Sequence, residues 1–121
     1  MLKGKIHRAT VTDADLDYVG SLTLDENLMD AVGFKEYEKI QVLDITNGNR
    51  VETYVIRGER DSGKVCINGA AAHLIHENDL VIILAYCQLN DGEAQNHIPK
   101  IVHVNTENRI TIKSNKEPIF K

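Results

Sequence analysis

The tetrapeptide "TNGN" (residues 46–49) constrains the fold most strongly, because it joins two strand-like segments of similar length. "KIQVLDI" precedes it and "RVETYVI" follows it, and both segments are rich in residues that favour β-strands. Asn and Gly tolerate the positive φ angles that a tight hairpin turn requires. The sequence therefore predicts an antiparallel hairpin over residues 39–56.

Further short segments have the same character. They are "KGKIHRATV" (3–11), "GSLTLD" (20–25), "LVIILAYC" (80–87) and a second hairpin in which "NTEN" joins "KIVHV" to "RITIK". Asp25 as an N-cap and Gly33 as a C-terminal signal predict one short helix, and "TDADLDY" (12–18) predicts a turn or a single helical turn. Because 121 residues suit one domain, we expect a mainly β protein, a small β-barrel with one or two short helices, over residues 1–121.

Charge and composition exclude several classes of function. A net charge of −4 and a pI near 5.7 argue against a nucleic-acid partner. No apolar run approaches the ~18 residues that span a bilayer, and "MLKGKIHR" lacks the apolar region of a signal peptide. Cys66 and Cys87 are therefore expected to be reduced and buried in a cytoplasmic protein. His73 and His76 have ligand spacing but lack a third ligand, so no metal site is predicted.

The dipeptide Gly20-Ser21 lies between strand-like residues in "YVGSLTL", where a loop sequence is not expected. A serine hydroxyl can attack the preceding carbonyl if the backbone is held in an unusual conformation, and glycine leaves that carbonyl unshielded. The amide would become an ester, and elimination would cut the chain to leave a dehydroalanine. Addition of water to the dehydroalanine and release of its nitrogen as ammonia would then leave a pyruvoyl group. The ordinary interpretation of such a dipeptide is a turn.

Four segments, in order, resemble the pyruvoyl-dependent aspartate decarboxylase family: "GKIHRATVTDADLDYVGS" (4–21), "TNGNRVETY" (46–54), "NGAAAH" (68–73) and "NDLVIILAY" (78–86). The resemblance implies a double-psi β-barrel, assembled as a homotetramer, whose chain cleaves itself between Gly20 and Ser21. The products would be a β chain of residues 1–20 and an α chain of residues 21–121. It also implies a covalent pyruvoyl cofactor made from Ser21, with or without an accessory maturation protein. The implied reaction converts L-aspartate to β-alanine and CO2 for pantothenate biosynthesis.

The resemblance also assigns roles to individual residues. Ser21 and Tyr54 are implied to be catalytic, with Tyr54 as the proton donor, and Thr53 is implied to assist the cleavage. Arg50 is implied to bind the substrate carboxylate, for which a planar, permanently charged guanidinium is suited. The full set of implied substrate-binding residues is Arg50, Thr53, Gly69, Ala70, Ala71, Asn68, Lys5 and His7.

Other interpretations stay open. Arg50 could be a solvated hairpin arginine, Tyr54 a half-buried strand aromatic, and "NGAAA" a turn leading into a short alanine-rich helix. Asp13 stands where many family members carry histidine, which puts a proton-transfer role at that position in doubt. The whole chain could be a non-catalytic barrel module with an uncut Gly20–Ser21 bond. It could also be a pyruvoyl decarboxylase for another small acidic amino acid, such as glutamate.

Overall fold

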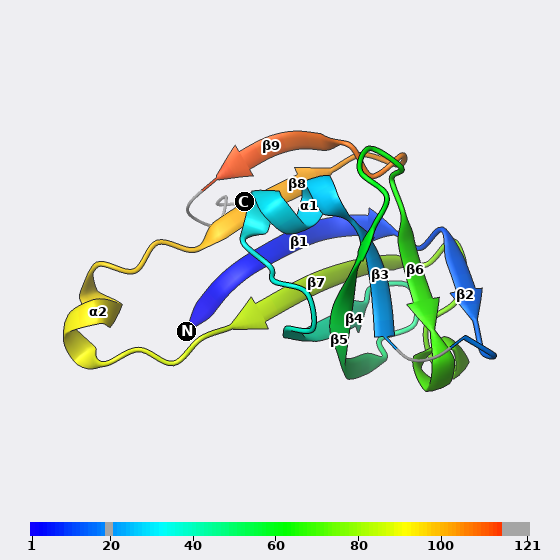
Figure 1. The fold of residues 1–121 in the computed structure, drawn as a ribbon, viewed down its shortest axis with the longest axis horizontal. Helices are drawn as coiled ribbons and strands as arrows, with labels where there is room; N and C mark the ends of the chain where they lie inside the picture. Colours follow the sequence, from blue (N-terminus) through cyan, green and yellow to red (C-terminus); the bar gives the residue numbers. More distant parts are fainter. Residues whose placement is uncertain (19–20, 115–121) are drawn as a thin grey trace.

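The computed structural model of the chain describes residues 1–18 and 21–114. These residues form one nine-stranded sheet, two short α-helices and one 3-10 helix (Figure 1). The strands are β1 (Leu2–Thr10), β2 (Asp13–Asp15), β3 (Ser21–Asp25), β4 (Lys39–Asp44), β5 (Arg50–Gly58), β6 (Val65–Asn68), β7 (Leu80–Tyr86), β8 (Lys100–Val104) and β9 (Ile110–Ser114). The helices are α1 (Glu26–Val32), η1 (Gly69–His73) and α2 (Asp91–Gln95). The predicted mainly β fold, a small barrel with short helices, is confirmed.

The sheet closes into a barrel because the chain from β1 to β2 bridges its two sides. β1 pairs with β7 and β8, whereas β2 pairs with β6, and the sheet order between these partners is β6-β3-β5-β4-β7. Between β1 and β2, the Val11 N–H donates to the Asp79 carbonyl and the Thr12 N–H to the Val65 carbonyl, both at 2.9 Å. The N-terminal segment therefore contacts both sides of the sheet and completes the barrel wall.

Local signals in the sequence predicted several elements correctly. β4 and β5 form the expected antiparallel hairpin, and β8 and β9 form the second one. α1 begins after Asp25, whose side chain accepts a hydrogen bond from the Asn27 N–H, and ends at Gly33, with φ 76°. The interpretation of residues 12–18 as a turn was wrong in part. Asp13–Asp15 is a strand there, because it pairs in parallel with β6.

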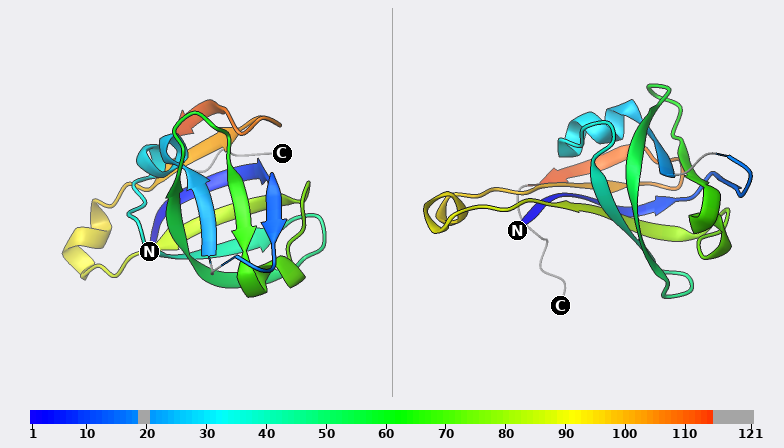
Figure 2. Two further views of the ribbon diagram at one scale, coloured as in Figure 1. Left: turned by 45° about the vertical axis from the view of Figure 1, so that its right-hand side comes forward. Right: turned by 60° about the horizontal axis from the view of Figure 1, so that its bottom comes forward.

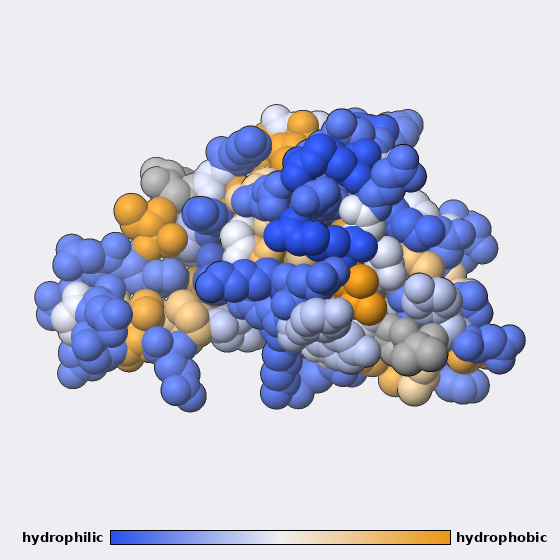
Figure 3. All heavy atoms as spheres, in the orientation of Figure 1, coloured by the Kyte–Doolittle hydropathy of each residue, from blue (hydrophilic) through white to orange (hydrophobic). Residues whose placement is uncertain are grey.

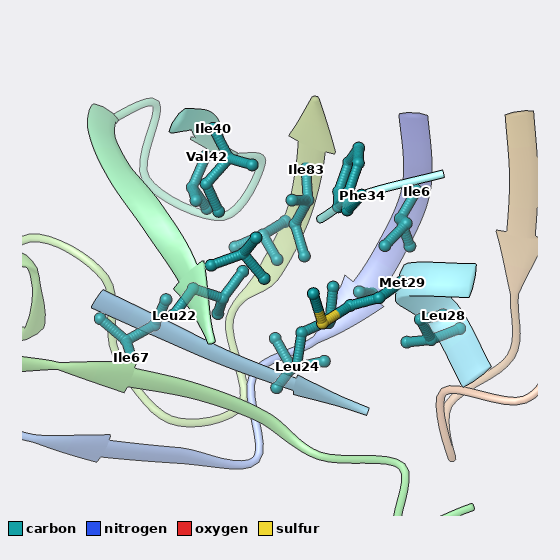
Figure 4. Packing of buried hydrophobic residues seen from close by; sticks show 14 of the residues in the cluster. Ile6, Leu22, Leu24, Leu28, Met29, Phe34, Ile40, Val42, Ile67 and Ile83 are labelled. Carbon is teal, nitrogen blue, oxygen red and sulfur yellow. The ribbon is translucent and has the colours of Figure 1, made fainter. Parts of the chain in front are cut away.

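The core lies between α1 and the inner face of the sheet (Figure 4). Figure 4 shows Leu22 and Leu24 of β3 and Ile67 of β6 on the same side as Met29 of α1. Gly4 permits the close approach of β1 to α1, because a Cβ atom there would lie 2.4 Å from the Val32 carbonyl oxygen. α1 therefore packs directly against β1.

The segment between β7 and β8 projects from the barrel as an arm with α2 at its tip (Figures 1 and 2). α2 has a capping box between Asn90 and Glu93 and buries none of its residues. On the face drawn in Figure 3, hydrophilic side chains predominate and apolar ones form small, separate patches. Of the two cysteines, both free, Cys66 is buried as predicted, whereas Cys87 is only half-buried. Among the described residues, the helices are too short and too polar to cross a membrane.

Candidate active site

Ser21 is the first residue of β3 and lies between β5 and β6. Leu22 pairs with Val55 on β5, so that Ser21 is level with Tyr54, and on the other side Ser21 pairs with Asn68 of β6. Ser21 is only 2% exposed, and its Oγ atom has no hydrogen-bond partner among the described residues. Buried hydroxyls are normally hydrogen-bonded, so this orphaned Oγ atom needs a functional explanation.

The backbone of Ser21 is strained. Its φ angle is 95°, in a region that non-glycine residues rarely adopt and that costs of order 1–3 kcal/mol. Ser21 pairs with Asn68 on β6, and the next residue, Leu22, pairs with Val55 on β5, so the chain is held at and directly after the strained residue. Ser21 therefore has the unusual backbone conformation that the sequence-based hypothesis of self-cleavage requires, and its hydroxyl has no hydrogen-bond partner among the described residues. The other predicted cleavage residue, Gly20, lies outside the described residues.

A pocket of about 300 Å³ opens beside Ser21. Its wall combines the start of β3 with β5 and the segment around η1. The lining residues are Ser21, Val51, Glu52, Thr53, Tyr54, Asn68, Ala70, Ala71 and Leu74. The structure thus brings six of the predicted site residues together: Ser21, Thr53, Tyr54, Asn68, Ala70 and Ala71. A larger pocket of about 530 Å³, beside α1, contains none of the predicted residues and is a weaker candidate.

Alternation along β5 separates the roles of its residues. Thr53 is half-buried, on the same side of the strand as buried Val55, whereas Tyr54 lies on the opposite face and is 37% exposed. The Tyr54 ring contacts Tyr37, with centroids 6.3 Å apart. Tyr54 can therefore present its hydroxyl at the mouth of the pocket while its ring packs against a neighbour.

Asn68 connects β6 to η1 beside the pocket. It is buried, and Gly69 adopts a φ angle of 69°, which turns the chain into η1. The turn leaves Ala70 exposed and Ala71 half-buried at the pocket wall, where their small side chains leave room for a ligand. Gly69 itself is buried and does not line the pocket.

Arg50, Lys5 and His7 are not among the lining residues. Arg50 is exposed at the start of β5, four residues before Tyr54, which corresponds to about 13 Å of strand. Lys5 and His7 share the half-buried face of β1, as predicted, and the His7 ring lies 4.8 Å from that of His103. In the sheet order, β5, β4 and β7 separate β3 from β1. None of these three residues therefore lines the Ser21 pocket of the single chain.

The part of the chain that the structure describes contains no group of three or more His, Cys, Asp or Glu side chains arranged to hold a metal ion. His73 and His76 are both exposed, and the Nε2 atom of His76 lies 3.2 Å from the His73 carbonyl oxygen. Asp13 lies on β2 opposite Cys66, and its carboxylate accepts a hydrogen bond from the Thr12 hydroxyl at 3.1 Å.

Sequence reasoning missed several neighbours of the site. Leu74 lines the pocket and Tyr37 contacts Tyr54, but neither lies in a motif. Thr23 and Cys66 also hydrogen-bond to Asn68. Because side chains alternate between the two faces of a strand, the sequences "SLTLD" and "VCIN" could have placed Thr23 and Cys66 on the same face as Ser21 and Asn68.

The fold and the site define a class: a small closed β-barrel protein with a strained, buried serine beside a ligand-sized pocket. Comparison with known families identifies the particular one. The family model described as aspartate decarboxylase matches residues 1–111, and the chain belongs to the aspartate decarboxylase family.

Curated relatives are similar over nearly their whole length. An aspartate 1-decarboxylase of Caldicellulosiruptor saccharolyticus is 60% identical over 97% of this chain and 91% of the relative. That of Corynebacterium efficiens is 59% identical over 98% of this chain and 89% of the relative. That of Clostridium beijerinckii is 56% identical over 97% of this chain and 94% of the relative.

Proposed function

We propose that this chain is an aspartate 1-decarboxylase that converts L-aspartate to β-alanine and CO2 for pantothenate biosynthesis. Near-full-length similarity to relatives of that name supports the activity. The observation that carries the proposal in the structure is Ser21, which is buried, strained and without a partner for its hydroxyl among the described residues.

Ser21 is proposed to cleave the chain. Its Oγ atom attacks the Gly20 carbonyl carbon, the C–N bond breaks, and the acyl group moves from nitrogen to oxygen to give an ester. Loss of the Cα proton then expels the Gly20 carboxylate and leaves a dehydroalanine at position 21. Addition of one water and release of one ammonia complete the conversion to a pyruvoyl group. The products are a β chain of residues 1–20 and an α chain of residues 21–121.

The residues around Ser21 fit such a group. Its place beside the pocket is bounded by Asn68 and by the small side chains of Ala70 and Ala71, which leave space for a substrate of the size of aspartate. A pyruvoyl group supplies a carbonyl that accepts the electron pair released as the substrate carboxylate leaves as CO2.

The chain's own residues bind the substrate and move its protons. Tyr54, level with Ser21 and partly exposed, donates a proton to the carbon that loses CO2. Thr53 and Asn68 offer hydrogen bonds at the pocket wall and Thr53 also assists the cleavage, while the bend at Gly69 directs Ala70 and Ala71 toward the ligand.

The remaining predicted residues are proposed to act between subunits. Arg50, Lys5 and His7 lie away from the pocket of their own chain, although a dicarboxylate substrate needs cationic partners. In a homotetramer, these cationic and imidazole side chains would face the Ser21 pocket of a neighbouring chain, where Arg50 would bind a carboxylate with both of its terminal nitrogens.

The experiment measures β-alanine formed from L-aspartate by purified protein whose mass has been determined, with L-glutamate as the competing substrate. Cleaved protein that forms β-alanine supports the proposal. Folded protein that stays uncut and inactive would instead indicate a non-catalytic barrel module, and a preference for glutamate would reassign the substrate.

A further inference from the structure

Four polar or weakly polar residues share one face of the β3–β6 pair, opposite the core. Ser21 pairs with Asn68 and Thr23 pairs with Cys66, and strand alternation places all four on the same side. The intervening residues point the other way, and Figure 4 shows Leu22, Leu24 and Ile67 in the core. Thr23 and Cys66 therefore form the row of side chains next to Ser21 and Asn68.

Both of these neighbours hydrogen-bond to the Asn68 side chain. The Nδ2 group of Asn68 donates to Thr23 Oγ1 at 2.9 Å, and the Cys66 thiol donates to Asn68 Oδ1 at 3.1 Å. Asn68 is 2% exposed and Cys66 is 7% exposed, so water competes little for these bonds. One N–H of the Asn68 amide has no partner among the described residues, and it lies on the residue that pairs with Ser21.

In the observed orientation of the Asn68 amide, the oxygen faces the Cys66 thiol and the nitrogen faces the Thr23 hydroxyl. An amide oxygen accepts a hydrogen bond from a thiol, whereas an amide nitrogen has no lone pair to offer. Burial raises the pKa of the Cys66 thiol, and the nearby Asp13 carboxylate raises it further, so the thiol keeps the proton that it donates. Cys66 and Thr23 therefore hold the amide through both of its polar atoms, the oxygen and the nitrogen.

Without these two hydrogen bonds, the Asn68 side chain would have space to rotate into a neighbouring pocket. Asn68 lines both the Ser21 pocket and a second pocket of about 480 Å³, to which Thr23, Cys66 and Asp13 also contribute. Asn68 thus separates the two spaces. Loss of its partners would let the amide turn toward the second pocket and away from Ser21.

We infer that Thr23 and Cys66 are positioning residues, which hold the Asn68 amide in a single orientation beside the reacting group at position 21. This inference rests on the proposed function. A donor fixed in advance stabilises developing negative charge more effectively than one that must reorient during the reaction. Thr23 and Cys66 act only through Asn68, so they should influence turnover without contacting the substrate.

The experiment uses two variants of Thr23, one that removes its hydroxyl group and one that reduces its volume. Thr23→Val keeps the volume and removes the hydroxyl, whereas Thr23→Ser keeps the hydroxyl and removes a methyl group. We expect Thr23→Val to lower kcat for L-aspartate roughly tenfold, the effect of one lost hydrogen bond, and Thr23→Ser to restore kcat to within about twofold of the parent. A packing role predicts the opposite order, because the serine variant would then be the more impaired.

Variants of Cys66 provide the second test. Combined with a Thr23 variant, they form a double-mutant cycle that measures whether the two residues act together. Cys66→Ala should lower kcat, whereas Cys66→Ser retains a donor and should restore it. The double variant Thr23→Val/Cys66→Ala should lose less than the product of the two single losses, because both act through one side chain. Thr111→Val on β9 and Cys87→Ala are the matched controls, and both should leave kcat unchanged.

For every variant, intact mass gives the cleaved fraction and thermal unfolding gives Tm. The values of kcat and KM are determined on cleaved protein. If Thr23→Val turns over at the parental rate, or Thr23→Ser is as slow as Thr23→Val, Thr23 has no positioning role. Additive losses in the double variant would show that Thr23 and Cys66 do not act together. A parent that forms no β-alanine would reject the proposed function itself, and the positioning role with it.

Discussion

A buried pair of carboxyl groups, Asp44 and Asp79, joins the hairpin that precedes Arg50 to the start of β7. Asp44 Oδ1 accepts hydrogen bonds from the N–H groups of Thr46 at 2.8 Å and Asn47 at 3.2 Å. Asp79 Oδ2 accepts one from the His76 N–H at 2.9 Å, and its distance to His76 Nδ1 is 3.8 Å. The Oδ2 atom of Asp44 accepts no hydrogen bond from the described residues. A protonated Asp44 carboxyl group can instead donate a hydrogen bond to Asp79.

Burial, and then the interaction with Asp79, raise the pKa of Asp44 from 3.8 to about 6. Burial opposes ionisation of Asp79 too, but hydrogen bonds from Asp44 and the His76 backbone outweigh it and lower the pKa of Asp79. Because the pKa of Asp44 is raised in the folded state, its stabilising contribution is complete below pH 3.8 and is lost as the pH rises through about 6. The rise in the pKa of Asp44 corresponds to roughly 3 kcal/mol of folding free energy. The lowered pKa of Asp79 gives a pH dependence of the opposite sign.

Asp44→Asn should abolish this pH dependence. The amide keeps an oxygen for the Thr46 and Asn47 N–H groups and supplies an N–H to Asp79 at every pH. Between pH 4.5 and pH 7, the parent should lose roughly 2 kcal/mol of stability relative to the variant, which is roughly 6–10 °C in Tm for a chain of this size.

The assay is thermal unfolding of processed protein at the two pH values, at one fixed chain concentration because oligomerisation also affects Tm. Glu107→Gln, which removes an exposed carboxylate, is the matched control and should follow the parent. The account of the carboxyl pair would be refuted if Asp44→Asn followed the parent at both pH values, or if it lowered Tm equally at both.

Three further predictions concern the site. Tyr54→Phe keeps the ring that contacts Tyr37 but removes the acidic proton, so it should still cleave while losing ~10²–10⁴-fold in β-alanine formation; an unchanged rate in cleaved protein would assign the proton transfer to another group. Arg50→Lys keeps the charge but not the planar fork, and should mainly raise KM for aspartate in a steady-state assay; an unchanged KM would remove Arg50 from the substrate site. Light scattering should give the mass of four chains, and a fully active monomer would contradict the proposal that subunits share the site.

The sequence predicted those elements whose signals are local. Asn47-Gly48 predicted the β4–β5 hairpin correctly, although only Gly48 has the positive φ angle expected of both residues. Asp25 and Gly33 specified α1, because each signal acts within a few residues. β2 was missed because its three residues are a strand only through pairing with β6, more than fifty residues away in the chain. α2 was missed because none of its residues is buried, so no apolar periodicity marks it.

The site shows the same division. The resemblance pointed to Ser21, Thr53, Tyr54, Asn68, Ala70 and Ala71, which the structure places around one pocket. The strained φ angle of Ser21 could not be predicted, because Ser21 pairs with Asn68, which is nearly fifty residues further along the chain. The contacts of Asn68 with Thr23, and of Asp44 with Asp79, join residues distant in the chain and depend on the pairing of β3 with β6 and of β4 with β7.

The intact mass of the purified protein tests the central claim most directly, with Ser21→Ala as the control that lacks the attacking hydroxyl. The account predicts two fragments for the parent, residues 1–20 and residues 21–121, with the larger one lighter than a serine-ended chain by the mass of one ammonia. Ser21→Ala should remain a single full-length chain and form no β-alanine. A parent that is folded, remains full-length after prolonged warm incubation and nevertheless forms β-alanine would contradict the claim that Ser21 is the source of the catalytic carbonyl.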